Sequence, residues 1–152
     1  MIVLIIRFVL LVLLALLVGS MFGIWVGLNP ANLSAAAYIE QQQNAIRSLN
    51  MLLPALGAIC IVLTMVLAVL SKDDMRSRYL LAFAAILMLG AGLVTRFANQ
   101  PINVLVMKMN AQAPAPNWQQ LRDLWWHWHI VRSLAGIAAL ALALFGILGA
   151  KR

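Results

Sequence analysis

Five residues with side chains suited to binding or acid–base chemistry, followed by a glycine, recur at helical spacing towards the C-terminal end of the chain. Successive steps of four, three, four, three and four residues place them on one face of a helix: Trp118, Arg122, Trp125, His129, Arg132 and Gly136. An imidazole can accept a proton, and a guanidinium can stabilise an oxyanion. Because arginines that face lipid are unfavourable, we expect this face to point into a helix bundle or a wet cavity.

The same residues also have a structural interpretation. The two arginines could bind phospholipid headgroups, and His129 could be a hydrogen-bonded interfacial histidine. Trp126 and Trp128 point elsewhere on the helix and are typical of the aromatic belt at a membrane surface. The residue pattern leaves a polar pocket and a lipid-anchoring surface both open.

The sequence gives little support for a metal site or for thiol redox chemistry. His127 and His129 are two residues apart, so they point in different directions, and no other histidine could complete a bis-imidazole haem pair. A mononuclear metal site would need Glu40 or Asp123 beside one histidine, which gives few ligands. A single cysteine, Cys60, excludes quinone-thiol oxidoreductases of the two-cysteine kind. We expect neither a metal nor a cofactor.

Composition indicates that membrane helices must position these residues. Of the 152 residues, 64% are hydrophobic and 10% charged, and the mean hydropathy is +0.97, whereas soluble domains are about 25% charged. Apolar runs predict spans at about 2–28, 51–70, 79–97 and 130–150 in a single integral membrane domain over 1–152. The first run is longer than the apolar region of a cleavable signal, so we expect it to be retained. The expected fold is all-α, a transmembrane four-helix bundle without room for a soluble catalytic domain.

The net charge of +7 falls into two groups of basic residues. The first group marks the inner side: Arg7, Lys72, Arg76, Arg78, Lys151 and Arg152. The positive-inside rule then predicts that both termini are cytoplasmic. We expect the protein to be integral to the bacterial inner membrane. The second group falls on the outer side: Arg47, Arg96, Lys108, Arg122 and Arg132.

The positions of the charged residues argue against two functional classes. The basic residues form no stripe long enough to follow a nucleic-acid backbone, so we expect no nucleic-acid partner. The four acidic residues all lie outside the middle of the spans, which disfavours a proton-coupled exporter.

The two outer connections predict that helices 2 and 4 extend beyond the membrane on the outer side. Ser34 is a good N-cap for the helix formers that follow it, and Pro54 is expected to kink the second helix where it enters lipid. Asn117 resembles the start of a capping box, and no proline or glycine interrupts the fourth helix before Gly136. Between these helices, the proline-rich segment Ala98–Asn117 is expected to be an ordered, turn-rich loop.

Three features together resemble the anthrone oxygenase-like family of small four-helix integral membrane proteins. The first is the glycine-rich end of the first span with a following proline, and the second is Asn99-x-Pro101-x-Asn103. The third is the helical face from Trp118 to Arg132. The resemblance covers nearly the whole chain and is most specific between Asn99 and Arg132.

This resemblance implies that a polycyclic phenolic anthrone, or a quinone-like lipophilic compound, is oxidised by dioxygen without a metal or organic cofactor. In such a monooxygenase His129 would accept a proton, and Arg132 and Arg122 would stabilise phenolate and superoxide charge. The implied substrate-binding residues hold polar groups, stack on the rings or add positive charge: Asn99, Asn103, Trp118, Trp125 and Arg96.

Two alternatives to an enzyme stay open. The protein could bind a lipophilic ligand without chemistry, or it could be an accessory subunit of a membrane complex. The expected partners are membrane lipids, a lipophilic aromatic small molecule and a second copy of the chain in a homo-oligomer. Glycines such as Gly19 and Gly136 would provide close helix contacts under each interpretation.

Overall fold

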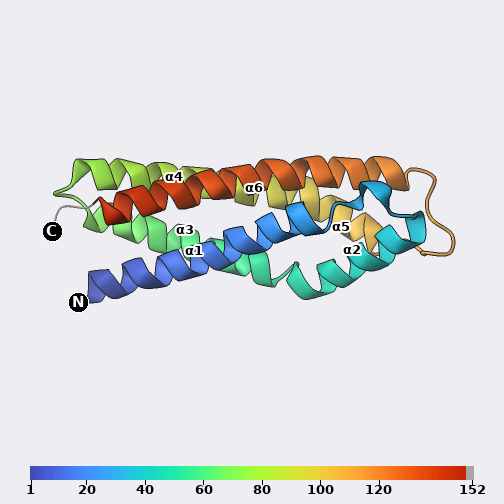
Figure 1. The fold of residues 1–152 in the computed structure, drawn as a ribbon, viewed down its shortest axis with the longest axis horizontal. Helices are drawn as coiled ribbons and strands as arrows, with labels where there is room; N and C mark the ends of the chain where they lie inside the picture. Colours follow the sequence, from blue (N-terminus) through green and yellow to red (C-terminus); the bar gives the residue numbers. More distant parts are fainter. Residues whose placement is uncertain (150–152) are drawn as a thin grey trace.

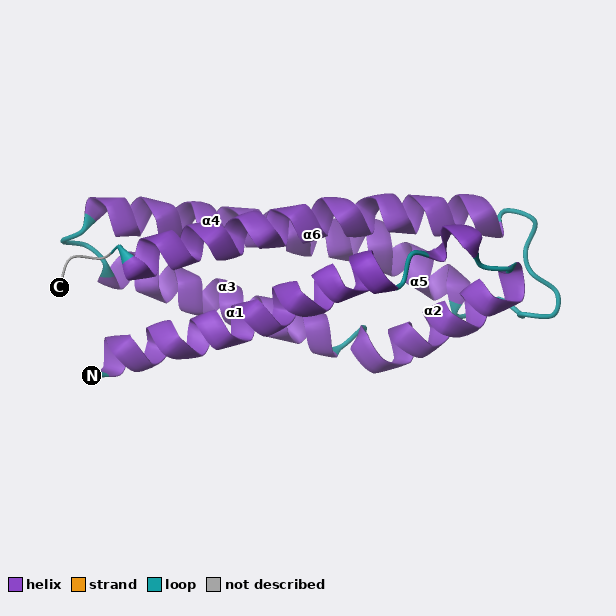
Figure 2. Cartoon of the chain, viewed as in Figure 1, coloured by secondary structure: helices purple, strands orange, loops and turns teal. Residues whose placement is uncertain are grey.

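The computed structural model describes residues 1–149 as a bundle of helices that run alternately up and down (Figures 1 and 2). Its long helices are α1 (Ile2–Gly27), α3 (Leu52–Leu70), α4 (Met75–Val94) and α6 (Trp118–Leu148). Shorter segments connect or extend them: η1 (Pro30–Asn32), α2 (Ala35–Leu49), η2 (Thr95–Asn99) and α5 (Gln100–Val106). Ala150, Lys151 and Arg152, which the sequence analysis assigns to the fourth span and the inner charge, lie outside the described residues.

The expected all-α fold with four spans is confirmed. Within residues 1–149, four helices are long and apolar enough to cross a membrane: Ile2–Asn32, Leu52–Leu70, Met75–Val106 and Trp118–Leu148. Large apolar side chains such as Phe8, Phe83 and Phe145 are more than half exposed, as expected for helices that face hydrocarbon. The chain is an integral membrane protein.

Close packing of α4 and α6 holds one half of the bundle together. Small residues on α6, including Ala139, Ala143 and Gly146, are buried against neighbouring helices. A Cβ atom at Gly146 would lie 3.3 Å from Leu80 Cβ and 3.4 Å from the carbonyl oxygen of Ser77. Glycine at this position is what permits the two backbones to approach.

The second helix is broken a few residues before the kink that the sequence predicts at Pro54. Ser34 caps α2 as expected, and its Oγ accepts a hydrogen bond from the amide of Ala37 at 3.3 Å. The helix ends at Leu49, and α3 begins at Leu52, so Pro54 lies in the first turn of α3. A proline costs little there because the first amides of a helix have no intrahelical partner. The position of α2 relative to the membrane stays a prediction.

The predicted loop over Ala98–Asn117 is wrong for its first half. The third span continues as helix to Val106 through the π-helical segment η2. A proline in a regular α-helix clashes with the carbonyl four residues earlier, which for Pro101 is that of Phe97. The wider π turn, in which the amide of Gln100 bonds to the carbonyl of Thr95, accommodates this ring.

Both ends of the described chain lie at the same end of the bundle. Figure 1 shows the N-terminus and the end of α6 beside the turn between α3 and α4, whereas α2 and α5 lie at the opposite end. This arrangement follows from an even number of spans. Which end faces the cytoplasm stays a prediction.

Replacing Gly146 with leucine is expected to destabilise the bundle by about 1–3 kcal/mol, because the added side chain overpacks the contact with α4. Gly90→Leu is the matched control, since a Cβ at Gly90 meets no atom within 4 Å. Thermal unfolding in detergent micelles, followed by circular dichroism, measures both variants. Equal unfolding temperatures for the two would contradict the packing argument.

Candidate functional site

His129 is fully buried at the centre of the polar face of α6. Its ring stacks on Trp125 with centroids 5.1 Å apart and also lies against Trp126 at 5.6 Å. On one side, its Nε2 lies 3.1 Å from the carbonyl oxygen of Met21 in α1. On the other, its Nδ1 lies 3.2 Å from Nε and 2.9 Å from Nη2 of Arg132.

These contacts define the hydrogen-bonding state of the imidazole. A guanidinium has donors and no acceptor, so Nδ1 of His129 must accept the hydrogen bond from Arg132. Nε2 then carries the ring proton and donates to the carbonyl of Met21. In this structure the lone pair that could take up a proton is therefore covered by Arg132.

Arg132 is a cation without an anionic partner. Its Nη1 donates to Thr95 Oγ1 at 3.3 Å, and its Cζ lies 5.6 Å from the centre of the Trp125 ring. Among residues 1–149 no carboxylate forms an ion pair with Arg132, whereas Arg122 pairs with Asp123. A partly buried charge without an ion-pair partner is unfavourable within a helix bundle, so this position favours the binding of an anion.

The two asparagines of the Asn99-x-Pro101-x-Asn103 motif both hold Trp125. Asn99 Nδ2 donates to the carbonyl of Trp125 at 3.0 Å, and Asn103 Oδ1 accepts from the indole Nε1 at 2.8 Å. Asn103 Nδ2 also donates to Asn50 Oδ1 at 2.9 Å, which links α5 to the turn between α2 and α3. The asparagines thus position the ring on which His129 and Arg132 are stacked.

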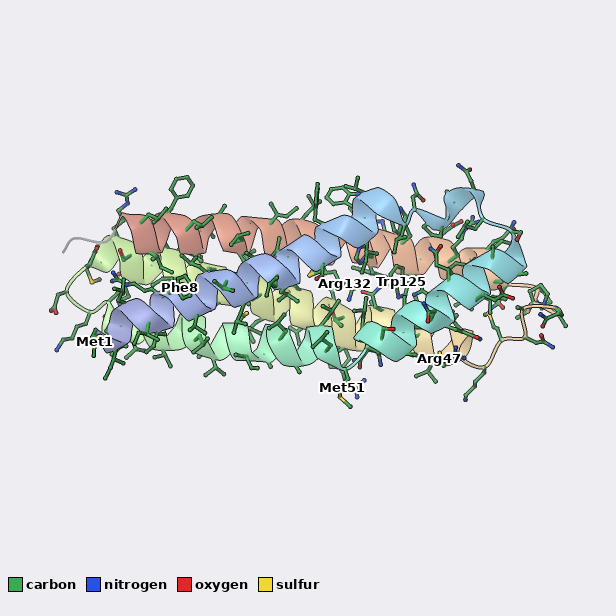
Figure 3. The ribbon with its side chains drawn as sticks, turned by 60° about the horizontal axis from the view of Figure 1, so that its bottom comes forward. Met1, Phe8, Arg47, Met51, Trp125 and Arg132 are labelled. Atoms are coloured by element: carbon green, nitrogen blue, oxygen red, sulfur yellow. The ribbon has the colours of Figure 1, made fainter. Side chains whose placement is uncertain are left out.

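Two adjoining cavities meet at Arg132. The polar cavity has a volume of about 60 Å³, and its polar lining comes from Gln41, Gln42, Asn50, Asn103 and Arg132. The apolar cavity has a volume of about 250 Å³ and lies among α1, α3, α4 and α6. Both are lined by Leu53, Pro54, Thr95 and Arg132. Figure 3 labels Trp125 and Arg132, which lie close together midway along the bundle.

The polar cavity contains an unused hydrogen-bond donor. Gln42 is 7% exposed and lines this cavity, and its Nε2 has no partner in the described part of the chain. Asn99 Oδ1, which lines neither cavity, is likewise buried without a partner among the described residues. Buried polar groups are usually hydrogen-bonded, so the unpaired amide of Gln42 indicates space for water or for a polar group of a ligand.

Sequence reasoning missed Thr95, Gln42 and Asn50. Thr95 could have been found, because Thr95, Asn99 and Asn103 recur every four residues along one helix face. Gln42 and Asn50 had no such signal, since their place beside Arg132 follows from the packing of α2 on distant parts of the chain.

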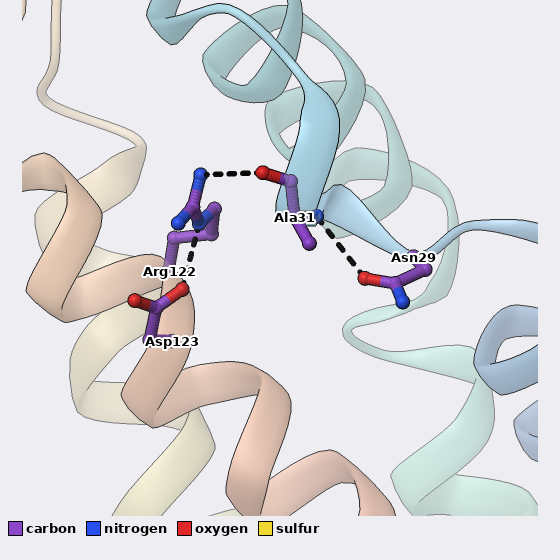
Figure 4. A network of polar contacts seen from close by, with 4 residues as sticks. All are labelled: Asn29, Ala31, Arg122 and Asp123. Carbon is purple, nitrogen blue, oxygen red and sulfur yellow. Dashed lines mark hydrogen bonds and ion pairs between the residues drawn. The ribbon is translucent and has the colours of Figure 1, made fainter.

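Arg122 and Trp118 lie apart from His129. Arg122 is ten residues from Arg132, which is about 15 Å along a helix. It donates to the carbonyl of Ala31 at 3.2 Å and pairs with Asp123 at 2.8 Å (Figure 4). It also lies over the Trp118 ring. Neither residue lines either cavity. They tie η1 to the start of α6.

Tyr38 belongs to the region around Trp118, whereas Arg96 lies at the edge of the apolar cavity. Tyr38 packs against Trp118, and burial raises the pKa of its phenol to about 12, so it stays protonated at neutral pH. Arg96 is exposed, lies 5.9 Å from the centre of the Phe97 ring and lines the apolar cavity at the end that Arg132 occupies.

Comparison with known proteins identifies one family. The family described as anthrone oxygenase matches residues 43–142, which are 100 of the 152 residues and include both the asparagine motif and the His129 face. No curated protein and no solved structure matches the chain.

Nitrogen NMR can test the hydrogen bonds of His129. With His127→Asn, ¹⁵N-labelled histidine reports on His129 alone, and we expect a proton on Nε2 and an unprotonated Nδ1 at neutral pH. The same measurement on an added Arg132→Gln change is expected to shift the Nδ1 signal. A proton on Nδ1 in the unsubstituted site would contradict the geometry.

Proposed function

This chain belongs to the anthrone oxygenase family, and we propose that it oxidises a lipophilic phenolic compound with dioxygen at the site formed by His129 and Arg132. The proposal depends on Arg132, which has no ion-pair partner among the described residues. Its side chain lines both cavities and donates to the Nδ1 lone pair of His129. A phenolate oxygen is an anion that fits this position.

Binding of the phenolate would activate His129. The substrate oxygen competes with Nδ1 of His129 for the donors of Arg132, so the guanidinium turns towards the substrate. Nδ1 is then free to take a proton from the acidic carbon of the substrate. The hydrogen bond from Nε2 to the carbonyl of Met21 holds the ring in place and stabilises the imidazolium that forms.

The oxidation balances without a further reductant. The carbanion passes one electron to dioxygen, and the radical pair combines to form a carbon–oxygen bond. The imidazolium returns its proton to the peroxide, and loss of the second carbon-bound hydrogen as a proton breaks the oxygen–oxygen bond. One oxygen atom becomes the new carbonyl, and the other leaves as water. Arg132 stabilises the negative charge that lies on oxygen in each step.

The orientation in the membrane is part of this proposal. Arg7, Lys72, Arg76 and Arg78 gather at the end of the bundle that contains the turn between α3 and α4. We assign this end to the cytoplasmic side of a bacterial inner membrane, with both termini there.

His129→Asn is expected to reduce oxygen-dependent turnover of an anthrone by about a hundredfold or more, because asparagine can still accept from Arg132 but cannot act as the base. Oxygen uptake and quinone absorbance in membranes containing the protein measure the reaction. His127→Asn, at an exposed position, is the matched control. Arg132→Gln is expected to lose turnover together with binding of the anionic substrate.

Two outcomes would redirect the assignment. Unchanged turnover in a folded His129→Asn variant would remove His129 from the mechanism. Binding of the anthrone without oxygen uptake in the unsubstituted protein would support the ligand-binding alternative, which uses the same Arg132.

A further inference from the structure

The apolar cavity is long and has a polar end. On α4 and its continuation the lining extends from Met88 to Gln100, about 18 Å of helix, and on α1 from Leu14 to Met21, about 10 Å. Arg96, Gln100 and Arg132 line the cavity near one end. Hydrocarbon and thioether side chains line the other end. The cavity therefore has one polar end and one apolar end, which matches the two ends of an amphiphilic molecule.

The volume of the cavity limits what it can hold. An apolar cavity of about 150 Å³ is enough for benzene. The volume of about 250 Å³ is spread along several helical turns, so the cavity is narrow. This shape suits a hydrocarbon chain, with the ring system that carries the chain at the end lined by Arg132.

The cavity also reaches the lipid-facing surface. Ala58 on α3 and Gly92 on α4 line it and are nevertheless exposed, and both lie within candidate membrane spans. A Cβ at Gly92 would meet no atom within 4 Å. An opening between these two small residues would lie between the adjacent helices α3 and α4, within the candidate spans.

We propose that the ligand is a membrane-dissolved amphiphile that enters from the lipid between Ala58 and Gly92, with its acidic oxygen on Arg132 and its hydrocarbon tail in the apolar cavity. The inference rests on the proposed function in taking Arg132 as the anion-binding group. It adds that the substrate class is a tailed phenolic compound, and that Ala58 and Gly92 determine which tails are accepted.

Binding of two probes in lipid nanodiscs tests this inference. One probe is a hydroxynaphthoquinone, which is an anion at neutral pH, and the other is the same compound with a dodecyl tail. Quenching of tryptophan fluorescence measures their affinity, because Trp125 contacts Arg132. Probe concentrations are expressed per lipid, and each variant is compared with the unsubstituted protein for the same probe, so partitioning into the bilayer cancels.

Gly92→Leu and Ala58→Leu are expected to weaken binding of the tailed probe by about tenfold or more and of the tail-less probe by less than about twofold, because the new side chains fill the space of several methylene groups. Gly90→Leu, two residues from Gly92 and outside the cavity lining, is the matched control and should change neither affinity. Equal losses for both probes, or no loss for either, would overturn the inference.

An oxygen electrode separates this inference from the proposed function. If the tail-dependent pattern of binding holds but the protein consumes no oxygen with a dodecyl-substituted anthrone, the proposed oxidation fails and the ligand site stands. If oxygen is consumed equally by the unsubstituted, Gly92→Leu and Ala58→Leu proteins, the oxidation stands and the tail site fails.

Discussion

The positive charge of Arg132 is the constraint on which the rest of the site depends. It lies inside an apolar helix bundle, and no carboxylate among residues 1–149 neutralises it. Its donors are met instead by an imidazole lone pair and a threonine hydroxyl, and its flat face lies over an indole. Neutral acceptors and a π-face offset part of the lost hydration but do not cancel the charge. A site built in this way keeps its affinity for an anion.

The acceptors around Arg132 are held in place by parts of the chain that are distant in sequence. Thr95 begins the π-helical segment that Pro101 makes necessary, and this segment also carries Asn99. Asn99 and Asn103 hold Trp125 from one side, while the carbonyl of Met21 holds His129 from the other. The irregular turn is therefore the feature that directs three side chains of one span towards the fourth helix. π-helical turns inside long helices are often found at functional sites for this reason.

Sequence reasoning recovered the four spans and the face of α6, because both depend on local periodicity and on hydropathy. It placed Trp125, His129 and Arg132 together correctly, since residues three and four apart on a helix are neighbours. It failed at Ala98–Val106, where proline and asparagine are typical of loops but the π turn allows the helix to continue. It also could not locate the break at Asn50, whose side chain bonds to Asn103 across 53 residues of chain.

The shared position of Arg132 couples ligand binding to base activation. In the structure the guanidinium of Arg132 donates to Nδ1 of His129, so the imidazole has no free lone pair. An anionic oxygen that enters from the apolar cavity draws the same donors away, because a charge-assisted hydrogen bond to an anion is about twice as strong as one to a neutral acceptor. In the proposed oxidation, His129 would therefore be exposed as a base when a substrate is present to be deprotonated. Under that proposal the substrate oxygen binds to Arg132 before the carbanion forms and meets dioxygen.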